Sequence, residues 1–299
     1  MTEMSASPEI QFAETPLLNI AYERRGMGPP ALLLHGWPDS PRTWDQVTPA
    51  LVERGYSTIA PYTRCYGKTS FKDAATERSG QVTAQAQDVI DLMDALGIEK
   101  AVIVGHDWGC IAGYALAALW PERIERLVAI SVGYETGVMS GKDVEPVQGR
   151  AFWYQWLWNT DRGREALQGN HLNICRFLWQ TWAPSFNFTE EEFQETAKSW
   201  DNPDWVEFTL HAYRVRWGAA SNDGRYTSLE AQLLKHPKIT VPTTVLHGEE
   251  DGASLVNSSE GQESSFKAGY LRKALRGVGH FVPREDPQAV IEAVLNPPS

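Results

Sequence analysis

The sequence predicts an α/β protein with a mostly parallel, doubly wound sheet and an inserted helical segment. Short apolar strands alternate with longer stretches of helical periodicity in the first and last parts of the chain. Strands that alternate with helices form parallel sheets covered by helices on both faces. Between about 139 and 226 the alternation stops, and the sequence is helix-like, aromatic and charged. Because ligands bind beyond the carboxyl ends of parallel strands, we expect this segment to form a cap over that edge of the sheet.

The individual elements follow from short apolar runs and from apolar residues at helical spacing. Some expected strands are buried-type runs that end at turn residues, such as 31–34 before His35-Gly36 and 57–60 before Pro61. The segment 81–96 has apolar residues at helical spacing and ends at Gly97, and 111–120 is rich in small residues that pack close to a sheet. These patterns predict strands at 17–24, 31–34, 57–60, 100–104, 127–132, 243–246 and 270–275, and helices at 81–96, 111–120 and 287–295.

The chain divides into a core made of two separate parts and one cap between them. We expect 1–136 and 228–299 to build the core and 137–227 to build the cap. At 299 residues, one core with a sizeable insertion is an ordinary arrangement. The first dozen residues and 296–299 look loose because they are polar or rich in proline.

Composition excludes some classes of partner. The net charge is -11 and the pI is near 5.2, which disfavours nucleic acid and anionic membranes. The segment 1–14 lacks the basic and then apolar build of a signal peptide, and no apolar run approaches the roughly 20 residues that cross a bilayer. Three scattered cysteines suggest free thiols in a reducing cytoplasm, without a disulfide framework or a zinc site.

The run Gly105-His106-Asp107-Trp108-Gly109 is the strongest chemical signal in the sequence. A Gly-x-nucleophile-x-Gly turn between a strand and a helix exposes the central side chain on a strained backbone, and the glycines avoid collisions with neighbouring elements. The amino end of the following helix favours negative charge. Asp107 is therefore the predicted nucleophile. A carboxylate attacks an sp3 carbon and leaves an alkyl ester, which a second group must hydrolyse.

His280 and Asp251 are the predicted partners of the nucleophile. His280 stands in a glycine-rich loop near the end of the chain, after the expected strand 270–275. The order nucleophile, acid, histidine is the one used by hydrolases with this type of turn. Of the three carboxylates after strand 243–246, Asp251 is chosen because it follows Gly248 by three residues, and Glu249 and Glu250 are expected to be solvated. The acid orients the imidazole so that its Nε2 atom can accept a proton from water.

The run His35-Gly36-Trp37-Pro38 follows a buried strand and predicts part of an oxyanion hole. In such turns one backbone N–H comes from this loop and the second from the residue after the nucleophile. Pro38 has no N–H, so the candidates are the amides of Trp37 and Trp108.

With these motifs the chain resembles the α/β-hydrolase-fold epoxide hydrolases, which are close relatives of the haloalkane dehalogenases. The resemblance covers about 16–295. It implies an α/β-hydrolase fold and two cap tyrosines that donate hydrogen bonds to the epoxide oxygen, because a phenol is protonated at neutral pH. Tyr154 in Phe152-Trp153-Tyr154-Gln155 and Tyr213 in His211-Ala212-Tyr213-Arg214 occupy the matching positions. It also implies that a vicinal diol forms without a metal or an organic cofactor.

Two other functions remain open at this point. The first is dehalogenation of a haloalkane or haloacid by the same Asp107, with the halide held by the Trp108 indole and by a cap tryptophan (Trp153, Trp156, Trp179 or Trp182). The second is a non-catalytic binding protein, against which the retained nucleophile, acid and histidine argue. The many cap aromatics suggest a small apolar substrate, and we expect a monomer or homodimer in the cytoplasm.

Two residues depart from the family pattern in the loop after the third strand. The family usually has Arg-Gly-x-Gly there, often with an acidic residue two places earlier, and this chain has Tyr62 and Cys65. If the backbone at Cys65 needs a positive φ, its Cβ costs on the order of 1 kcal/mol of strain.

Overall fold

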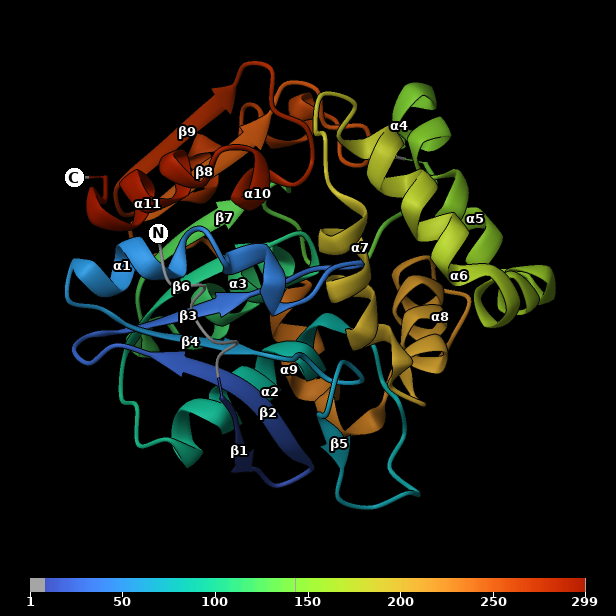
Figure 1. Ribbon diagram of the computed structural model, residues 1–299, viewed down its shortest axis with the longest axis horizontal. Helices are drawn as coiled ribbons and strands as arrows, with labels where there is room; N and C mark the ends of the chain where they lie inside the picture. The colour runs from blue at the N-terminus through green and yellow to red at the C-terminus, as the bar shows by residue number, and fades with distance from the viewer. Residues whose placement is uncertain (1–8, 143, 299) are drawn as a thin grey trace.

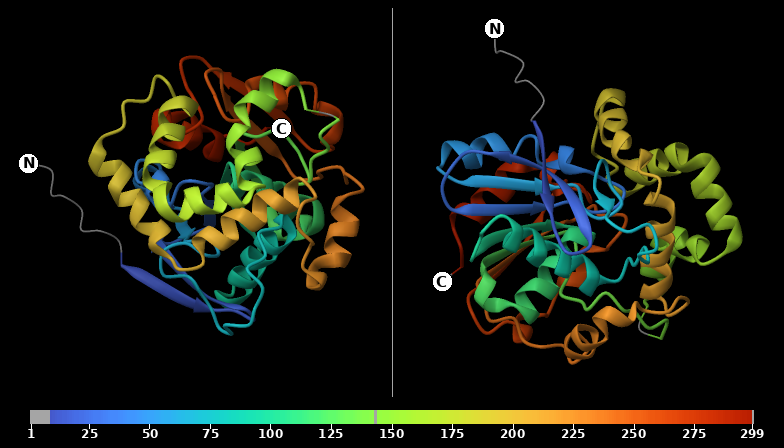
Figure 2. Two further views of the ribbon diagram at one scale, coloured as in Figure 1. Left: turned by 90° about the vertical axis from the view of Figure 1, so that its right-hand side faces the viewer. Right: turned by 90° about the horizontal axis from the view of Figure 1, so that it is seen from below.

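The fold is a mostly parallel sheet with helices on both faces and a helical cap at one edge, as seen in a computed structural model that describes residues 9–142 and 144–298 (Figures 1 and 2). The strand order is β1-β2-β4-β3-β6-β7-β8-β9, and β5 pairs with β2. β1 and β2 pair in antiparallel fashion, as do β2 and β4, and every pair from β4 to β9 along this order is parallel. The strands are β1 Ile10–Glu14, β2 Leu18–Arg25, β3 Pro30–Leu34, β4 Ser57–Pro61, β5 Ser70–Phe71, β6 Ala101–His106, β7 Ile124–Ile130, β8 Thr243–Gly248 and β9 Tyr270–Leu275.

The central strands are buried because helices cover both faces of the sheet. Every residue of β6 and β8 is buried, which explains their continuous apolar sequences. The two sides of the sheet form two apolar clusters, one with α2 (Val82–Ala95) and α3 (Trp108–Leu119), the other with α1 (Thr48–Glu53) and α11 (Pro287–Leu295). The doubly wound fold predicted from the alternation of strands and helices is confirmed.

The cap helices lie beyond the carboxyl ends of the parallel strands (Figure 1). They are α4 Pro146–Ala151, α5 Trp153–Trp158, α6 Asp161–Trp182, α7 Glu190–Ala197 and α8 Trp205–Arg216, and they separate β7 from β8. The next helix, α9 (Thr227–Leu233), contacts α3 of the core. We therefore propose 137–227 as the cap, between core parts 1–136 and 228–299.

The amino end of the described chain differs from the expectation of a loose segment. Ile10–Glu14 forms β1 and pairs along its whole length with Asn19–Glu23 of β2, although most of its side chains are not buried. The sequence pattern of β1 is weak because an edge strand with few buried side chains lacks a long apolar run. The last residues, 296–298, do carry no helix or strand, as expected.

The strand order reverses between β3 and β6, which places two loops on either side of one crevice. From β3 the chain moves outward to β4, and it then returns to β6 on the opposite side of β3. Such a switch point opens a crevice at the carboxyl ends of the strands, where ligands bind in open parallel sheets. The loop His35-Gly36-Trp37 follows β3 and Asp107 follows β6, so both predicted motifs lie at this point.

Candidate active site

Asp107 lies on a sharp strand-to-helix turn between β6 and α3. Its φ is 52° and its ψ is -117°, a conformation that costs a non-glycine residue about 1–3 kcal/mol. A Cβ at Gly105 would collide with the backbone of Gly109, and one at Gly109 would collide with the carbonyl of Leu34. The glycines on both sides of the nucleophile are therefore required by close backbone packing, as the motif predicts.

His280 connects the nucleophile to the predicted acid. Its Nδ1 atom lies 2.8 Å from Oδ2 of Asp251, and its Nε2 atom lies 3.6 Å from Oδ2 of Asp107. The other oxygen of Asp251 accepts the amide N–H groups of Ala253 and Ser254, at 2.8 and 2.9 Å. The order Asp107, Asp251, His280 thus corresponds to one continuous triad, and Glu249 and Glu250 are exposed.

A carbonyl at the end of a cap helix holds the loops of the acid and the base. Trp182 is the last residue of α6, and its carbonyl accepts the amide N–H of Gly252 and the amide N–H of His280, each at 3.0 Å. Gly252 follows the acid directly. The cap is therefore hydrogen-bonded to both loops that complete the triad.

Nearby charges shift the pKa values of His280 and Asp251 in opposite directions. Burial alone would lower the pKa of His280, but the carboxylates of Asp251 and Asp107 outweigh it and raise the pKa to about 10. Burial alone would raise the pKa of Asp251, but His280 and His247 outweigh it and lower the pKa to about 2. In the free protein His280 is therefore a cation between two carboxylates at neutral pH.

The predicted oxyanion-hole residues adjoin the nucleophile. The Trp37 amide donates to Oδ1 of Asp107 at 2.8 Å. Trp108 is the first residue of α3, so its amide is one of the donors that have no acceptor within the helix. Gly36 is required here, because a Cβ at this position would collide with the Asp107 side chain.

Both predicted tyrosines reach the same cavity from the cap. Tyr154 comes from α5 and Tyr213 from α8; both are buried, and their ring centroids lie 5.5 Å apart. Burial, followed by the nearby charge of Asp107, raises the pKa of Tyr154. Burial likewise raises the pKa of Tyr213 well above its usual value. Both phenols therefore stay protonated across the physiological pH range.

The cavity is narrow and combines apolar walls with a few polar groups. Its lining includes Asp107, His280 and both tyrosines, and also residues that the sequence did not single out: Ile111, Val132, Phe152, Gln155, Arg216, Ala253 and Ser254. Arg216 follows Tyr213 by three residues on a helix, so it shares that face, and this spacing could have indicated it. Gln155 is the direct neighbour of Tyr154, which the sequence alone does not mark as functional.

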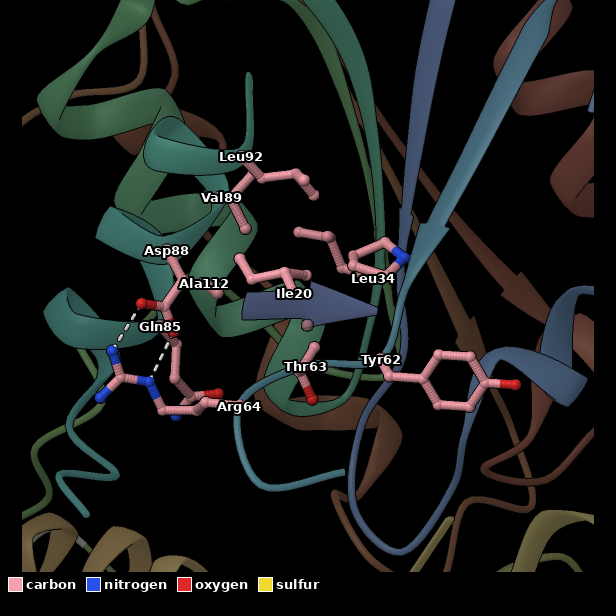
Figure 3. A pocket seen from close by; sticks show the side chains of 12 residues that line it. Ile20, Leu34, Tyr62, Thr63, Arg64, Gln85, Asp88, Val89, Leu92 and Ala112 are labelled. Carbon is pink, nitrogen blue, oxygen red and sulfur yellow. Dashed lines mark hydrogen bonds and ion pairs between the residues drawn. The ribbon is translucent and has the colours of Figure 1, made fainter. Parts of the chain in front are cut away.

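Tyr62 and Cys65 lie in a loop that is anchored by a buried ion pair. Arg64 contacts Asp88 through two hydrogen bonds of 2.5 and 2.6 Å (Figure 3). Cys65 has a φ of 65°, so the strain expected for its Cβ is present. The Tyr62 hydroxyl donates to Glu23 at 2.8 Å, pointing away from the ion pair. Figure 3 shows the separate cavity beside this loop, which none of the three triad residues lines.

The tryptophans that a dehalogenase would need are largely engaged elsewhere. The Trp108 indole donates to the Tyr213 hydroxyl at 3.1 Å. The indole of Trp179 donates to the Pro38 carbonyl, and that of Trp156 to the Gly149 carbonyl, each at 2.9 Å. Trp153 is partly exposed on the cap surface, and Trp182 packs its ring against His280. The geometry thus places two phenols in the lining of the cavity, whereas of these five tryptophans only Trp108 lines it.

The fold and the site define this chain as an α/β hydrolase, and comparisons with known proteins agree. Residues 29–287 match the alpha/beta hydrolase fold family, so the chain belongs to that family. A structure of a Klebsiella pneumoniae protein, provisionally named an epoxide hydrolase, is 38% identical with a TM-score of 0.91 and covers 96% of both chains.

Two curated proteins of similar length also carry epoxide hydrolase names. The epoxide hydrolase of Caballeronia sordidicola is 26% identical, over 93% of this chain and 90% of its own length. The soluble epoxide hydrolase of Corynebacterium sp. (strain C12) is 26% identical, over 92% of this chain and 91% of its own length. The resemblance drawn from the motifs is thereby confirmed.

Proposed function

We propose that this protein hydrolyses an epoxide to a vicinal diol through a covalent ester on Asp107. The proposal rests on one observation. The carboxylate of Asp107 and the phenol rings of Tyr154 and Tyr213 line the same cavity. A carboxylate can attack an sp3 carbon, and a phenol can donate a proton to the oxygen that leaves. The epoxide hydrolase names of the three similar proteins support the same reaction.

In the first step Asp107 opens the ring. Because Oδ1 already accepts the Trp37 amide, we assign the attack to Oδ2. A bond forms between Oδ2 and a ring carbon, the ring C–O bond breaks, and its electron pair goes to the epoxide oxygen. That oxygen takes a proton from one of the two tyrosines. The product is a hydroxyalkyl ester in which Oδ1 is the carbonyl oxygen.

In the second step His280 activates water. Ester formation removes the negative charge of Asp107, so one of the causes that raise the pKa of His280 disappears and the imidazole can lose its proton. Neutral His280, oriented by Asp251, then accepts a proton from water, whose oxygen attacks Cγ of Asp107. The Trp37 and Trp108 amides hold the charge on Oδ1. The diol leaves with the proton from His280, and the proton left on Asp107 replaces the one that the tyrosine gave. Water then returns to His280 the proton that the imidazole had released to water after ester formation.

The walls of the cavity suggest a small apolar substrate. Ile111, Val132 and Phe152 provide apolar surface beside the reacting groups. The proposed steps use only side chains, backbone amides and water. No helix in the described part of the chain is long and apolar enough to cross a membrane.

We also propose that the protein works in the cytoplasm as a monomer or homodimer, without nucleic acid or membrane partners. The three cysteines are free and buried, which suits a reducing compartment. All the residues assigned to the reaction come from one chain, so catalysis requires no partner subunit.

Replacing the base while keeping the nucleophile tests the covalent step. In H280Q, ring opening by Asp107 continues but water activation is lost, so we expect an adduct with the mass of the epoxide to accumulate on the protein. Turnover to diol should fall by at least about 100-fold. Intact-protein mass spectrometry after mixing with styrene oxide measures the adduct. The control is the double variant D107N/H280Q, which should carry none, and an unmodified H280Q protein under saturating substrate would contradict the proposal.

A substrate panel separates the epoxide reaction from the dehalogenase alternative. We expect diol from styrene oxide, cyclohexene oxide or a long-chain epoxide, and no halide from chloro- and bromoalkanes or haloacids of similar size. The reason is that the Trp108 indole is already bonded to Tyr213. Halide release without diol formation would assign the dehalogenase function instead, and binding without either product would indicate a non-catalytic protein.

A further inference from the structure

Each of the two cap tyrosines accepts a hydrogen bond from a neighbouring N–H group. The Trp108 indole N–H donates to the Tyr213 oxygen at 3.1 Å. The Gln155 side-chain amide donates to the Tyr154 oxygen at 2.8 Å. Gln155 is itself only 3% exposed, so its amide has few partners to choose from.

The direction of both bonds is fixed by chemistry. An indole has a donor and no acceptor, so Trp108 can only donate to Tyr213. A glutamine amide could present either its oxygen or its nitrogen, but the indole N–H of Trp217 occupies Oε1 of Gln155 at 2.9 Å. The indole requires an acceptor, and the amide nitrogen is therefore the atom that faces Tyr154.

A phenol whose oxygen already accepts one N–H must direct its own proton elsewhere. A phenol has one donor, and neither Gln155 Nε2 nor the Trp108 indole can accept it. Arg216, which lines the same cavity, also offers only donors, and its guanidinium pairs with Glu135. The remaining direction for both protons is the cavity in which Asp107 lies, where the acceptors are a ligand oxygen or, in the free protein, the oxygen of the other phenol.

We infer that Gln155, held by Trp217, and the Trp108 indole are positioning residues that point both phenol protons into the cavity. They make the tyrosine pair a site that donates hydrogen bonds to a ligand oxygen with lone pairs and no proton of its own, such as the ether oxygen of an epoxide. This inference rests on the proposed function for the reaction, but it also makes a prediction about binding alone. The two N–H donors further counteract the rise in pKa that burial causes in both phenols.

Q155E reverses the polarity of the bond to Tyr154. A carboxylate has no proton, so the Tyr154 hydroxyl would donate to it and be lost to the ligand. When the introduced carboxyl group is protonated, it can donate to Tyr154 as the Gln155 amide does. We therefore expect the ratio of the Q155E rate of ring opening to the wild-type rate to fall as the pH rises, by roughly 3- to 10-fold. Q155M, of similar length and without hydrogen-bonding groups, should show a ratio that does not change with pH. Single-turnover ester formation at several pH values measures both.

Binding of an unreactive acceptor separates this inference from the proposed function. N,N-Diethylacetamide offers an oxygen acceptor and no donor, and its binding can be followed by tryptophan fluorescence. Its affinity for Q155E should fall with rising pH in the same way, relative to wild type, and Y154F should bind it weakly at every pH. This pattern without diol formation from any epoxide would support the role of Gln155 and contradict the epoxide reaction. Diol formation with a pH-independent Q155E ratio would contradict the role of Gln155.

W217F provides a second variant in case Q155E does not fold. Without the indole donor, the Gln155 amide can turn its oxygen toward Tyr154 and accept the phenol proton. We expect slower ring opening in W217F, with hydrolysis of the ester unchanged, because the phenol proton is used only in the first step. Equal slowing of both steps, or no change in ring opening, would overturn the assignment.

Discussion

At the scale of single residues, the charge of Asp107 determines what His280 can do. In the free protein both carboxylates keep the imidazole protonated, and its pKa of about 10 is far above neutral pH. A protonated imidazole cannot act as a base, but it can pair with the carboxylate that attacks. When the ester forms, that partner becomes neutral and the imidazole becomes the base that the second step requires. The order of the two steps is thus built into the electrostatics of the site.

This coupling predicts how the pKa of His280 responds to each carboxylate. D107N imitates the neutral ester, so it should lower the pKa of His280 from about 10 toward the ordinary value of 6.5. D251N should lower it further, because the charge of Asp251 is the largest of the causes that raise it. NMR titration of the His280 ring measures both values. E249Q, a change at an exposed neighbour of the acid, should leave the titration unchanged. An unchanged His280 titration in D107N would refute the coupling.

The sequence predicts the reacting residues and the acid beside His280, but not the pair Gln155 and Trp217 beside Tyr154. Asp107, Asp251 and His280 stand in motifs whose glycine spacing reflects a local backbone requirement, so they can be recognised without tertiary information. Trp217 orients Gln155 from 62 positions away. Such a pair is created by the packing of α5 against the end of α8, and no spacing rule within one element indicates it.

At the scale of elements, the turn from β6 to α3 is held by backbone contacts that leave no room for side chains. α3 begins directly at Trp108, and its second residue, Gly109, packs against the backbone at the end of β3. This close approach brings the nucleophile next to the Trp37 amide across the switch point. The positive φ of Asp107 is maintained by these contacts on both sides.

Adding one methyl group at Gly109 should therefore destabilise the fold. In G109A the new Cβ collides with the Leu34 carbonyl, and neither backbone can move away cheaply. We expect a loss of about 1–3 kcal/mol in the free energy of unfolding, measured by urea denaturation. The matched control is G169A, an exposed position beside the kink of α6 at Asn170, where a Cβ meets no atom within 4 Å, and it should change the free energy of unfolding by less than about 0.5 kcal/mol. Similar effects of the two changes would show that the close packing at Gly109 is not required.

Strands that are buried on both faces of the sheet could be predicted, because their sequences are continuous apolar runs. The fully buried strands β6 and β8 lie within a few residues of their predicted positions. α3 starts three residues earlier than the expected helix at 111–120, because the helix begins immediately after the nucleophile. β1 was missed because its burial is sparse, and pairing with β2 rather than an apolar face defines it.

At the scale of the whole molecule, the triad makes stability depend on pH. The pKa of His280 is raised in the folded state, from 6.5 to about 10. Its contribution to stability is therefore complete below pH 6.5 and is lost as the pH rises toward 10. Between these two pH values His280 holds up to one more proton in the folded protein than in the unfolded chain.

Between about pH 7 and 8.5 we expect the free energy of unfolding to fall by up to about 1.4 kcal/mol per pH unit. Urea denaturation at several pH values measures the slope. H280Q removes this contribution, so its slope should be smaller than that of the wild type. The slope that remains comes from the three buried thiols, whose pKa values are also raised by burial and which act in the same direction near pH 8.5. A wild-type slope equal to that of H280Q would mean that His280 is not protonated in the folded protein.

The carbonyl of Trp182 links the position of the cap to the order of the triad. It accepts the amides of Gly252 and His280, next to the acid and at the base. If the carboxyl end of α6 were to lift away, both bonds would break and the loops carrying Asp251 and His280 would lose their common anchor. In a molecule that is open at this end, Asp251 and His280 would no longer be held in place by this contact. Opening of the cap at this end and loss of an ordered triad would therefore occur together.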